Sequence, residues 1–160
     1  MKHEKFVKNM NSKFFEKGKI LVPVDGSDYC KKALDFAINL VKMYSAEMWL
    51  VHVAPYSTVL LAGIGDSETE GYSNVDDLLE KSGQDILNNC LDEAKKQGVQ
   101  AKTKLFRGHP GIKIIQYAKN EGFNLIVLGS RGLSGASRFL LGSVSDYVSD
   151  NAECPVIIVK

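Results

Sequence analysis

Residues Leu125 to Ser145 read LIVLGSRGLSGASRFLLGSVS, and this stretch decides the fold and the expected site. It begins with four apolar residues, a run too short for a helix, which predicts a strand buried on both faces. Four glycines and four serines then lie between Gly129 and Ser143. Helical spacing of apolar residues starts directly afterwards, and we expect Ser143 to be the N-cap. The predicted order is strand, glycine-rich loop and helix.

The glycine-rich loop has the composition of an anion-binding loop. Glycines let the backbone approach a ligand closely, and the start of the next helix offers unpaired N–H groups and a partial positive charge. Arg131 and Arg138 are its only charged residues, and no Asp or Glu occurs between Leu125 and Ser145. The loop therefore predicts a phosphate cradle. The alternative is a flexible surface loop before an ordinary helix.

Length and composition predict one globular domain. The 160 residues are 44% hydrophobic and 24% charged, with a formal net charge of +1, which gives no support for nucleic-acid binding. No apolar run approaches the roughly 20 residues of a membrane span, and no secretory signal is recognisable. Cys30, Cys90 and Cys154 are widely spaced, which favours buried reduced thiols in a cytoplasmic protein over a disulfide framework.

Strand and helix patterns alternate along residues 19–160, after an N-terminal extension at 1–18 whose pattern fits a short basic amphipathic helix. The predicted strands cover 19–24, 46–53, 99–107, 125–128 and 156–159. The predicted helices begin after Ser27, span 75–97, begin at Pro110 with Ile112, Ile115 and Ala118 buried, and begin after Ser143. Residues 54–74 form a long connection. This order predicts a single-domain α/β fold with an open parallel five-stranded sheet and helices on both faces, Rossmann-like in class.

Two strands carry ligand-like residues at their carboxyl ends. Asp25 follows the first strand and Gly129 ends the fourth. Ligands of open parallel sheets bind where the strand order reverses, so the order 3-2-1-4-5 would place both in one crevice. Asp25 is either a ligand-binding carboxylate or a turn or capping residue. His52 lacks a second ligand at metal-binding spacing and is expected to be a satisfied strand residue.

The spacing Gly129-x2-Gly132-x9-Gly142-Ser143 resembles the signature of the universal stress protein family, in its nucleotide-binding branch, and no P-loop motif is present. The resemblance covers Lys19 to Lys160 and includes Gly108-His109-Pro110 after the third strand. It implies contacts of Pro23, Val24 and Asp25 with the nucleoside, and of the Val53 backbone with the adenine edge. For the ribose and phosphates it implies Gly129, Ser130, Arg131, Gly132, Gly142, Ser143, Val144 and Ser145, with hydroxyl donors at Ser143 and Ser145.

The resemblance implies an ATP-binding stress sensor or regulator with at most slow hydrolysis and no identified catalytic residue. It also implies Mg²⁺ or Mn²⁺ on the phosphates, with Asp25 as the nearest carboxylate, and a homodimer joined through the last strand, Val156 to Val159. The regulatory protein partner is not identifiable from the sequence. Two alternatives remain open: a nucleotide-free dimeric interaction module, and a small enzyme that hydrolyses or transfers nucleotides.

Overall fold

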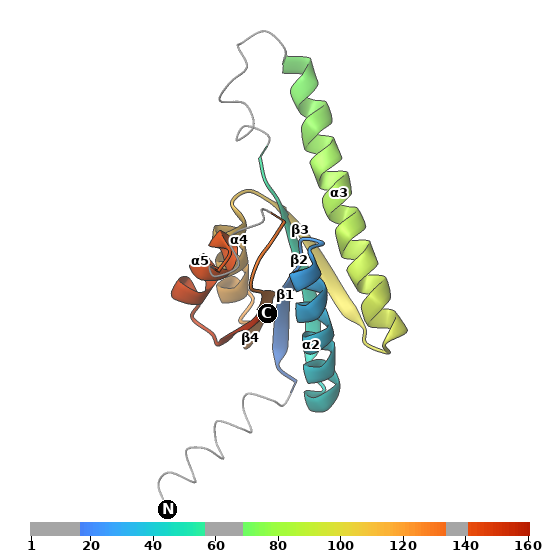
Figure 1. Cartoon of the computed structure of the whole chain (residues 1–160), viewed down its shortest axis with the longest axis vertical. Coiled ribbons are helices and arrows are strands. Elements are labelled where there is room, and N and C mark those ends of the chain that lie inside the picture. Colours follow the sequence, from blue (N-terminus) through green and yellow to red (C-terminus); the bar gives the residue numbers. More distant parts are fainter. Residues whose placement is uncertain (1–16, 57–68, 134–140) are drawn as a thin grey trace, which may run out of the picture.

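The computed structural model describes residues 17–56, 69–133 and 141–160, which form a parallel sheet between two layers of helices (Figure 1). The strands are β1 (Lys19–Pro23), β2 (Glu47–Ala54), β3 (Ala101–Arg107), β4 (Leu125–Gly129) and β5 (Val156–Val159), in the order β3-β2-β1-β4-β5. This confirms the predicted fold class and strand order. The predictions for residues 1–16, for most of the connection after β2 and for Ser134, Gly135, Ser137 and Arg138 lie outside the described residues.

The central strand β1 is buried on both faces, as its apolar sequence requires. Leu21 pairs with Trp49 of β2 on one side and with Ile126 of β4 on the other, and both Leu21 and Ile126 are fully buried. The strand ends at Pro23, which has no N–H group to continue a ladder. The Val24 N–H still bonds to the Val51 carbonyl of β2 at 2.8 Å, and Asp25 follows directly at this edge of the sheet.

Four helices are described: α2 (Asp28–Tyr44), α3 (Thr69–Lys96), α4 (Pro110–Asn120) and α5 (Ser143–Asn151). Helix α2 begins as predicted, because the Ser27 side chain accepts a hydrogen bond from the Cys30 N–H at 3.1 Å. Helix α4 begins at Pro110, as predicted, with His109 as its N-cap. None of the helices in the described ranges has the length and apolar character needed to cross a bilayer.

Helix α3 begins earlier than predicted and ends at Lys96, next to the predicted end at residue 97. It begins at Thr69 and not at residue 75, so part of the predicted connection is helical. Its first turns are tied to the sheet by Arg107, which pairs with Asp76 at 2.7 Å and Glu80 at 3.8 Å. At the other end the Val99 N–H bonds to the Ala94 carbonyl. Residues 98 and 99 therefore close the helix, and β3 starts only at Ala101.

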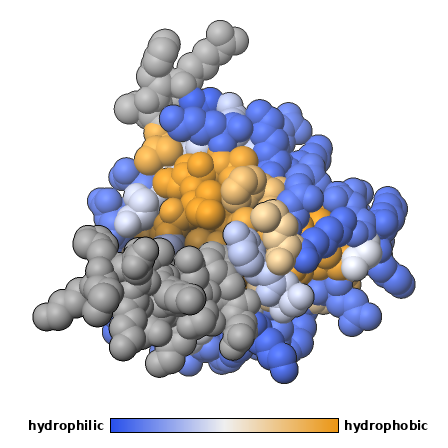
Figure 2. All heavy atoms as spheres, turned by 90° about the horizontal axis from the view of Figure 1, so that it is seen from below, coloured by the Kyte–Doolittle hydropathy of each residue, from blue (hydrophilic) through white to orange (hydrophobic). Residues whose placement is uncertain are grey.

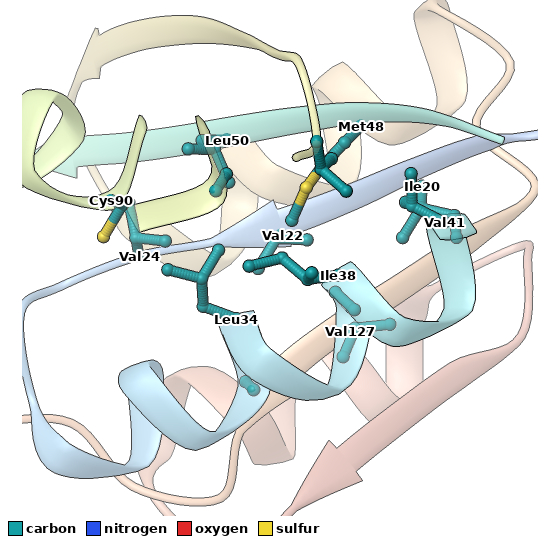
Figure 3. Packing of buried hydrophobic residues seen from close by; sticks show 14 of the residues in the cluster. Ile20, Val22, Val24, Leu34, Ile38, Val41, Met48, Leu50, Cys90 and Val127 are labelled. Carbon is teal, nitrogen blue, oxygen red and sulfur yellow. The ribbon is translucent and has the colours of Figure 1, made fainter. Parts of the chain in front are cut away.

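Two apolar layers hold the sheet between the helices. Helices α2 and α3 cover the face that carries Ile20, Val22 and Leu50 (Figure 3), and the α4–α5 layer covers the face that carries Leu21 and Val51. Both layers are densely buried. The helices are therefore fixed against the sheet, and their ends are fixed at its carboxyl edge.

The buried side of α4 was predicted partly wrongly. Ile112 is exposed, whereas Ile114 and Ala118 are buried. Gly111 explains which side of α4 is buried, because a Cβ atom there would lie 2.6 Å from Cδ1 of Tyr147 on α5. The glycine side of α4 packs closely against α5, which turns Ile112 outward.

Strand β5 lies at one end of the sheet, and among the described strands it pairs only with β4. Its four residues are half-buried, and an uncovered edge strand offers unpaired backbone groups to other chains.

Figure 2 shows an apolar area within a largely hydrophilic surface on the side of the molecule seen there.

Candidate functional site

A cavity of about 380 Å³ lies at the carboxyl ends of β1, β2 and β4. All predicted site residues except Ser130 line it: Pro23, Val24, Asp25, Val53, Gly129, Arg131, Gly132, Gly142, Ser143, Val144 and Ser145. The strand order brings these segments together, because β1 and β4 are neighbours. Their role in binding a ligand stays a prediction.

Ser130 lies behind the cavity wall. It is 3% exposed, and its hydroxyl has no hydrogen-bond partner among the described residues. Its backbone is fully used: the N–H bonds to the Val159 carbonyl at 2.8 Å, and the carbonyl accepts from the Gly142 N–H at 2.8 Å. Through these two backbone bonds Ser130 joins the end of β4 to β5 and to the N-cap of α5. It therefore fixes both ends of the glycine-rich loop without lining the cavity.

Asp25 makes the turn contact that was one of its two predicted roles, and its other role, as a ligand-binding carboxylate, stays a prediction. One carboxylate oxygen, Oδ1, accepts a hydrogen bond from the Ser27 N–H at 2.9 Å, which is the contact of a turn aspartate. The other, Oδ2, faces the loop, since a Cβ atom at Gly132 would lie only 2.6 Å from it. The turn contact holds the carboxylate so that its second oxygen remains directed at the cavity side.

The first turn of α2 supports the loop that follows β4. Gly129 lies against this turn so closely that a Cβ atom would come within 2.7 Å of the Tyr29 carbonyl carbon. Arg131 donates a hydrogen bond from Nη1 to the Tyr29 hydroxyl at 2.5 Å, and its guanidinium lies 5.1 Å from the centre of the Tyr29 ring. The Ser27 hydroxyl also reaches the Arg131 carbonyl, at 3.4 Å. A positive charge is thereby held at the cavity by α2.

The start of α5 was predicted one residue too late. Gly142 is the N-cap, it makes no side-chain cap hydrogen bond, and Ser143 is the first helical residue. A helix leaves its first N–H groups without acceptors inside the helix, and here Gly142, Ser143 and Val144 all line the cavity. A helix start without a side-chain cap is available to an external anion.

The expected donor role of Ser145 does not fit the observed geometry. Its hydroxyl is buried and lies 2.9 Å from the carbonyl oxygens of Ser130 and Gly142, to which it donates. The proton therefore ties the two ends of the glycine-rich loop together. Ser143, which is exposed, remains the serine of this turn whose hydroxyl can turn toward a ligand.

His52 is a satisfied strand residue, as predicted. Its Nδ1 lies 2.7 Å from the Val24 carbonyl, and no cluster of metal-ligating side chains occurs in the part of the chain that the structure describes. The ring also lines the cavity. Gly83 of α3 makes room for it, because a Cβ atom there would approach His52 Cδ2 to 2.5 Å.

Several cavity residues were missed by sequence reasoning. They are mainly apolar: Cys30, Val51, His52, Pro55, Pro110, Ile114, Leu128 and Leu133. Strand and helix periodicity marks Val51, Ile114 and Leu128 as core and does not distinguish a core residue from one at the rim of a cavity. The result is a cavity with apolar walls on one side and a glycine loop, a guanidinium and a helix start on the other. Such a site suits a ligand with a flat apolar part and an anionic part.

Comparisons with known proteins agree with this architecture. A model of the universal stress protein family matches residues 17–160. Universal stress protein YxiE of Bacillus subtilis is 42% identical over 145 residues, which cover 89% of this chain and 98% of the relative. The structure of universal stress protein UspA from Lactobacillus plantarum gives a TM-score of 0.75 at 28% identity, covering 91% of this chain and 99% of that one.

A more distant structure shares the fold and contains a ligand. It is a universal stress protein family protein from Arabidopsis thaliana, solved with AMP bound, with a TM-score of 0.64 and 22% identity. The match covers 89% of this chain and 91% of that one.

Proposed function

This chain belongs to the universal stress protein family, and from this premise we propose that it binds ATP in the cavity and acts as a sensor or regulator in a stress response. One observation carries the proposal: Asp25 and the start of α5 lie on the same cavity, which the glycine loop and Arg131 also line. Nucleotide complexes of proteins with this fold, such as the AMP complex from Arabidopsis thaliana, support it.

The polar side of the cavity suits the phosphates. The N–H groups at the start of α5 and of the glycine loop would donate to phosphate oxygens, and Arg131 would add a charge-assisted bond. Hydrogen bonds to charged groups contribute about 1.5–3 kcal/mol each. After the costs of association, several such bonds make a micromolar dissociation constant reasonable.

The apolar side of the cavity suits the nucleoside. Pro23, Val24 and Val53 form part of this wall, and a base placed there would meet the backbone at the end of β2. Asp25 Oδ2 would accept hydrogen bonds from the ribose. Because the base would be read mainly by backbone groups, we expect other adenine nucleotides to compete with ATP.

We also propose that Mg²⁺ or Mn²⁺ accompanies ATP. Asp25 is the only carboxylate among the described residues that line the cavity. One carboxylate does not form a protein metal site by itself, so the ion would be held mainly by the phosphates, as Mg²⁺ often is.

The donor set supports slow hydrolysis at most. Rapid phosphoryl transfer needs a residue that positions the attacking group, and Asp25 already accepts a hydrogen bond through Oδ1. A small nucleotide-processing enzyme and a nucleotide-free dimeric interaction module remain the alternative functions. The enzyme would release phosphate rapidly, and the interaction module would not bind ATP.

We further propose a homodimer joined through β5, a cytoplasmic location, and a division into an extension at residues 1–18 and a nucleotide-binding domain at 19–160. The half-buried edge position of β5 supports the dimer. The free thiols of the three cysteines support the location.

Replacement of Ile158 by Lys, in the middle of β5, tests the dimer. It should convert the dimer to a monomer in light scattering, and an unchanged dimer would contradict the β5 interface.

Isothermal titration calorimetry with MgATP tests the binding proposal, with phosphate release followed in the same samples. We expect micromolar binding by the wild type and at least about tenfold weaker binding by Gly132→Val, because the new side chain would collide with Asp25 Oδ2. Gly98→Ala is the matched control. Gly98 has φ +79° and no atom within 4 Å of its Cβ position, so this variant loses stability by strain and should keep its ATP affinity.

The outcomes separate the three functions. Binding that Gly132→Val weakens, with phosphate release near background, supports the sensor. Rapid phosphate release supports the enzyme. Absence of binding to a folded wild type refutes the proposal and leaves the interaction module.

A further inference from the structure

The chain that leaves β1 is held by a histidine side chain. The register of β1 with β2 ends where Pro23 lies opposite Val51. One more backbone bond follows, from the Val24 N–H to the Val51 carbonyl at 2.8 Å. In a continuing parallel ladder the Val24 carbonyl would next accept from the Val53 N–H, but this bond is absent among the described residues. The Val24 carbonyl lies instead 2.7 Å from Nδ1 of His52.

The His52 ring is fixed in the orientation that makes this contact. A carbonyl oxygen can only accept, so Nδ1 carries the proton of the hydrogen bond. Helix α3 bounds the ring, because a Cβ atom at Gly83 would lie 2.5 Å from Cδ2 and 3.0 Å from Nε2 of His52. The Val24 carbonyl is therefore directed toward the α3 side of the sheet, where the Val24 side chain also packs (Figure 3).

The backbone groups of Val53 point toward the cavity. Along a strand, the N–H and C=O groups of successive residues point alternately to the two neighbouring strands. In β2 the Val51 carbonyl accepts from Val24 on the β1 side, whereas the Ala54 carbonyl accepts from Gly108 on the β3 side. The groups of Val53 therefore point to the β1 side, beyond the end of β1, and Val53 lines the cavity there.

We propose that His52 is a positioning residue that sets the preference of the cavity for adenine. Its Nδ1–H holds the Val24 carbonyl away from the Val53 N–H, so both backbone groups of Val53 stay available to a ligand. This role rests on the proposed function, in which the base meets the backbone at the end of β2. His52 itself acts through Val24 and Val53.

The two groups of Val53 distinguish one purine from another. Adenine presents N1 as an acceptor and its 6-amino group as a donor on the same edge, which complements an N–H and a C=O group. Guanine presents N1–H as a donor and O6 as an acceptor at these positions. Each guanine group would therefore face a backbone group of its own kind, and a site built in this way excludes guanine by unpaired polar contacts.

Loss of the imidazole should remove this preference. Val24 is 4% exposed, and a buried carbonyl without a donor is unfavourable. The nearest backbone donor in ladder register is the Val53 N–H, so we expect the carbonyl to turn to it. The base would then lose one hydrogen bond, which corresponds to an affinity about fivefold weaker.

The first experiment uses the full chain without nucleotide. Long-range proton–nitrogen NMR identifies which ring nitrogen of His52 carries the proton, with His52→Asn as the reference that lacks the signal. We expect a protonated Nδ1 in the wild type and a Val53 amide that exchanges readily with solvent. In His52→Leu this amide should exchange at least about fivefold more slowly. A proton on Nε2 alone, or a protected Val53 amide in the wild type, would overturn the proposal without any variant.

The second experiment measures ATP and GTP binding by calorimetry for the wild type, His52→Leu and His52→Asn. Leucine fills similar space without a donor, whereas the asparagine amide places an N–H group near the position of Nδ1. We expect His52→Leu to lower the preference for ATP over GTP at least about fivefold, through weaker ATP binding at unchanged GTP affinity. His52→Asn should keep the preference within about twofold. Equal losses for ATP and GTP would show a purely structural role and would overturn the proposal.

The outcomes also separate this inference from the proposed function. A wild type that binds ATP and GTP equally well would overturn the role of His52 and leave ATP binding intact. A folded wild type that binds no ATP would overturn the proposed function and, with it, the adenine preference. The first experiment would still show whether His52 holds the Val24 carbonyl, because it contains no nucleotide.

Discussion

Replacement of Gly129 by Ala tests whether the contact between β4 and α2 builds the cavity. A Cβ atom at this residue would lie 2.7 Å from the carbonyl carbon of Tyr29 and 2.8 Å from its oxygen. Both are backbone atoms of the first turn of α2, so they cannot avoid the methyl group by a change of rotamer. Ordinary contact begins at 3.4 Å, and α2 must therefore move away from the sheet by roughly 0.7 Å.

The cost of this movement follows from the dense packing around it. Helix α2 lies on the central strands with Ala33, Ala37 and Ile38 fully buried, and overpacking of such an interface costs about 1–3 kcal/mol. For a chain of this length that loss lowers Tm by about 2–12 °C. The movement also shifts Tyr29 and Ser27, which hold Arg131. Loss of one charge-assisted contact of about 1.5–3 kcal/mol would weaken ATP binding by at least about tenfold.

Urea unfolding and ATP calorimetry on the same samples measure the two effects. Gly122→Ala serves as the control: its φ is +65° and no atom lies within 4 Å of its Cβ position. Left-handed backbone costs a side chain about 1–2 kcal/mol, so the control should lose similar stability at the amino edge of the sheet and keep its ATP affinity. If Gly129→Ala is as stable as the wild type within about 0.5 kcal/mol, the packing argument is wrong.

Three further predictions concern the supports of the site. Gly83→Ala should lower the free energy of unfolding in urea by about 1–3 kcal/mol, because the methyl group would lie 2.5 Å from His52 Cδ2. Alanine favours helices, so a gain in stability would show that this collision is absent. Tyr29→Phe removes the hydroxyl that accepts a hydrogen bond from Arg131 Nη1 and keeps the ring. Calorimetry should therefore show that the free energy of ATP binding weakens by about 1 kcal/mol and that the affinity for adenosine is unchanged. Equal losses for both ligands would speak against a role of this contact at the phosphates. Arg107→Met should lower the free energy of unfolding by about 1 kcal/mol or less. It should also speed hydrogen exchange in the first turns of α3, because Arg107 ties these turns to β3. Unaltered exchange would show that these turns are stable without Arg107.

The sequence predicts the sheet well because its signals there are local and consistent. Apolar runs such as 125–128 are bounded by glycine or proline, and helix starts such as Ser27 and Pro110 carry their own capping chemistry. The strand order depended on one further step, the rule that ligand-like residues gather where the order reverses. That rule joined Asp25 to Gly129, and the sheet has the predicted order.

The errors arise where a tertiary contact sets the phase of an element. Ile112 faces outward because Gly111 packs on Tyr147 of the next helix, and a periodicity limited to one helix cannot show this. Helix α5 starts at Ser143 because Gly142 is held by its own N–H bond to the Ser130 carbonyl. Capping preference alone favours serine over glycine as the N-cap, and the loop closure overrides it.

The least predictable part of the site is the set of contacts that support it. Residue type identifies groups that can face a ligand, such as Asp25 and Arg131, but it does not show which atoms are already occupied. Here the Ser145 proton is donated to loop carbonyls and one Asp25 oxygen is bound in a turn. The contacts available to an anion are therefore mostly backbone N–H groups, whose positions depend on how α2 and β4 approach each other. It follows that glycine substitutions at that contact should disturb the cavity more than polar substitutions at its rim.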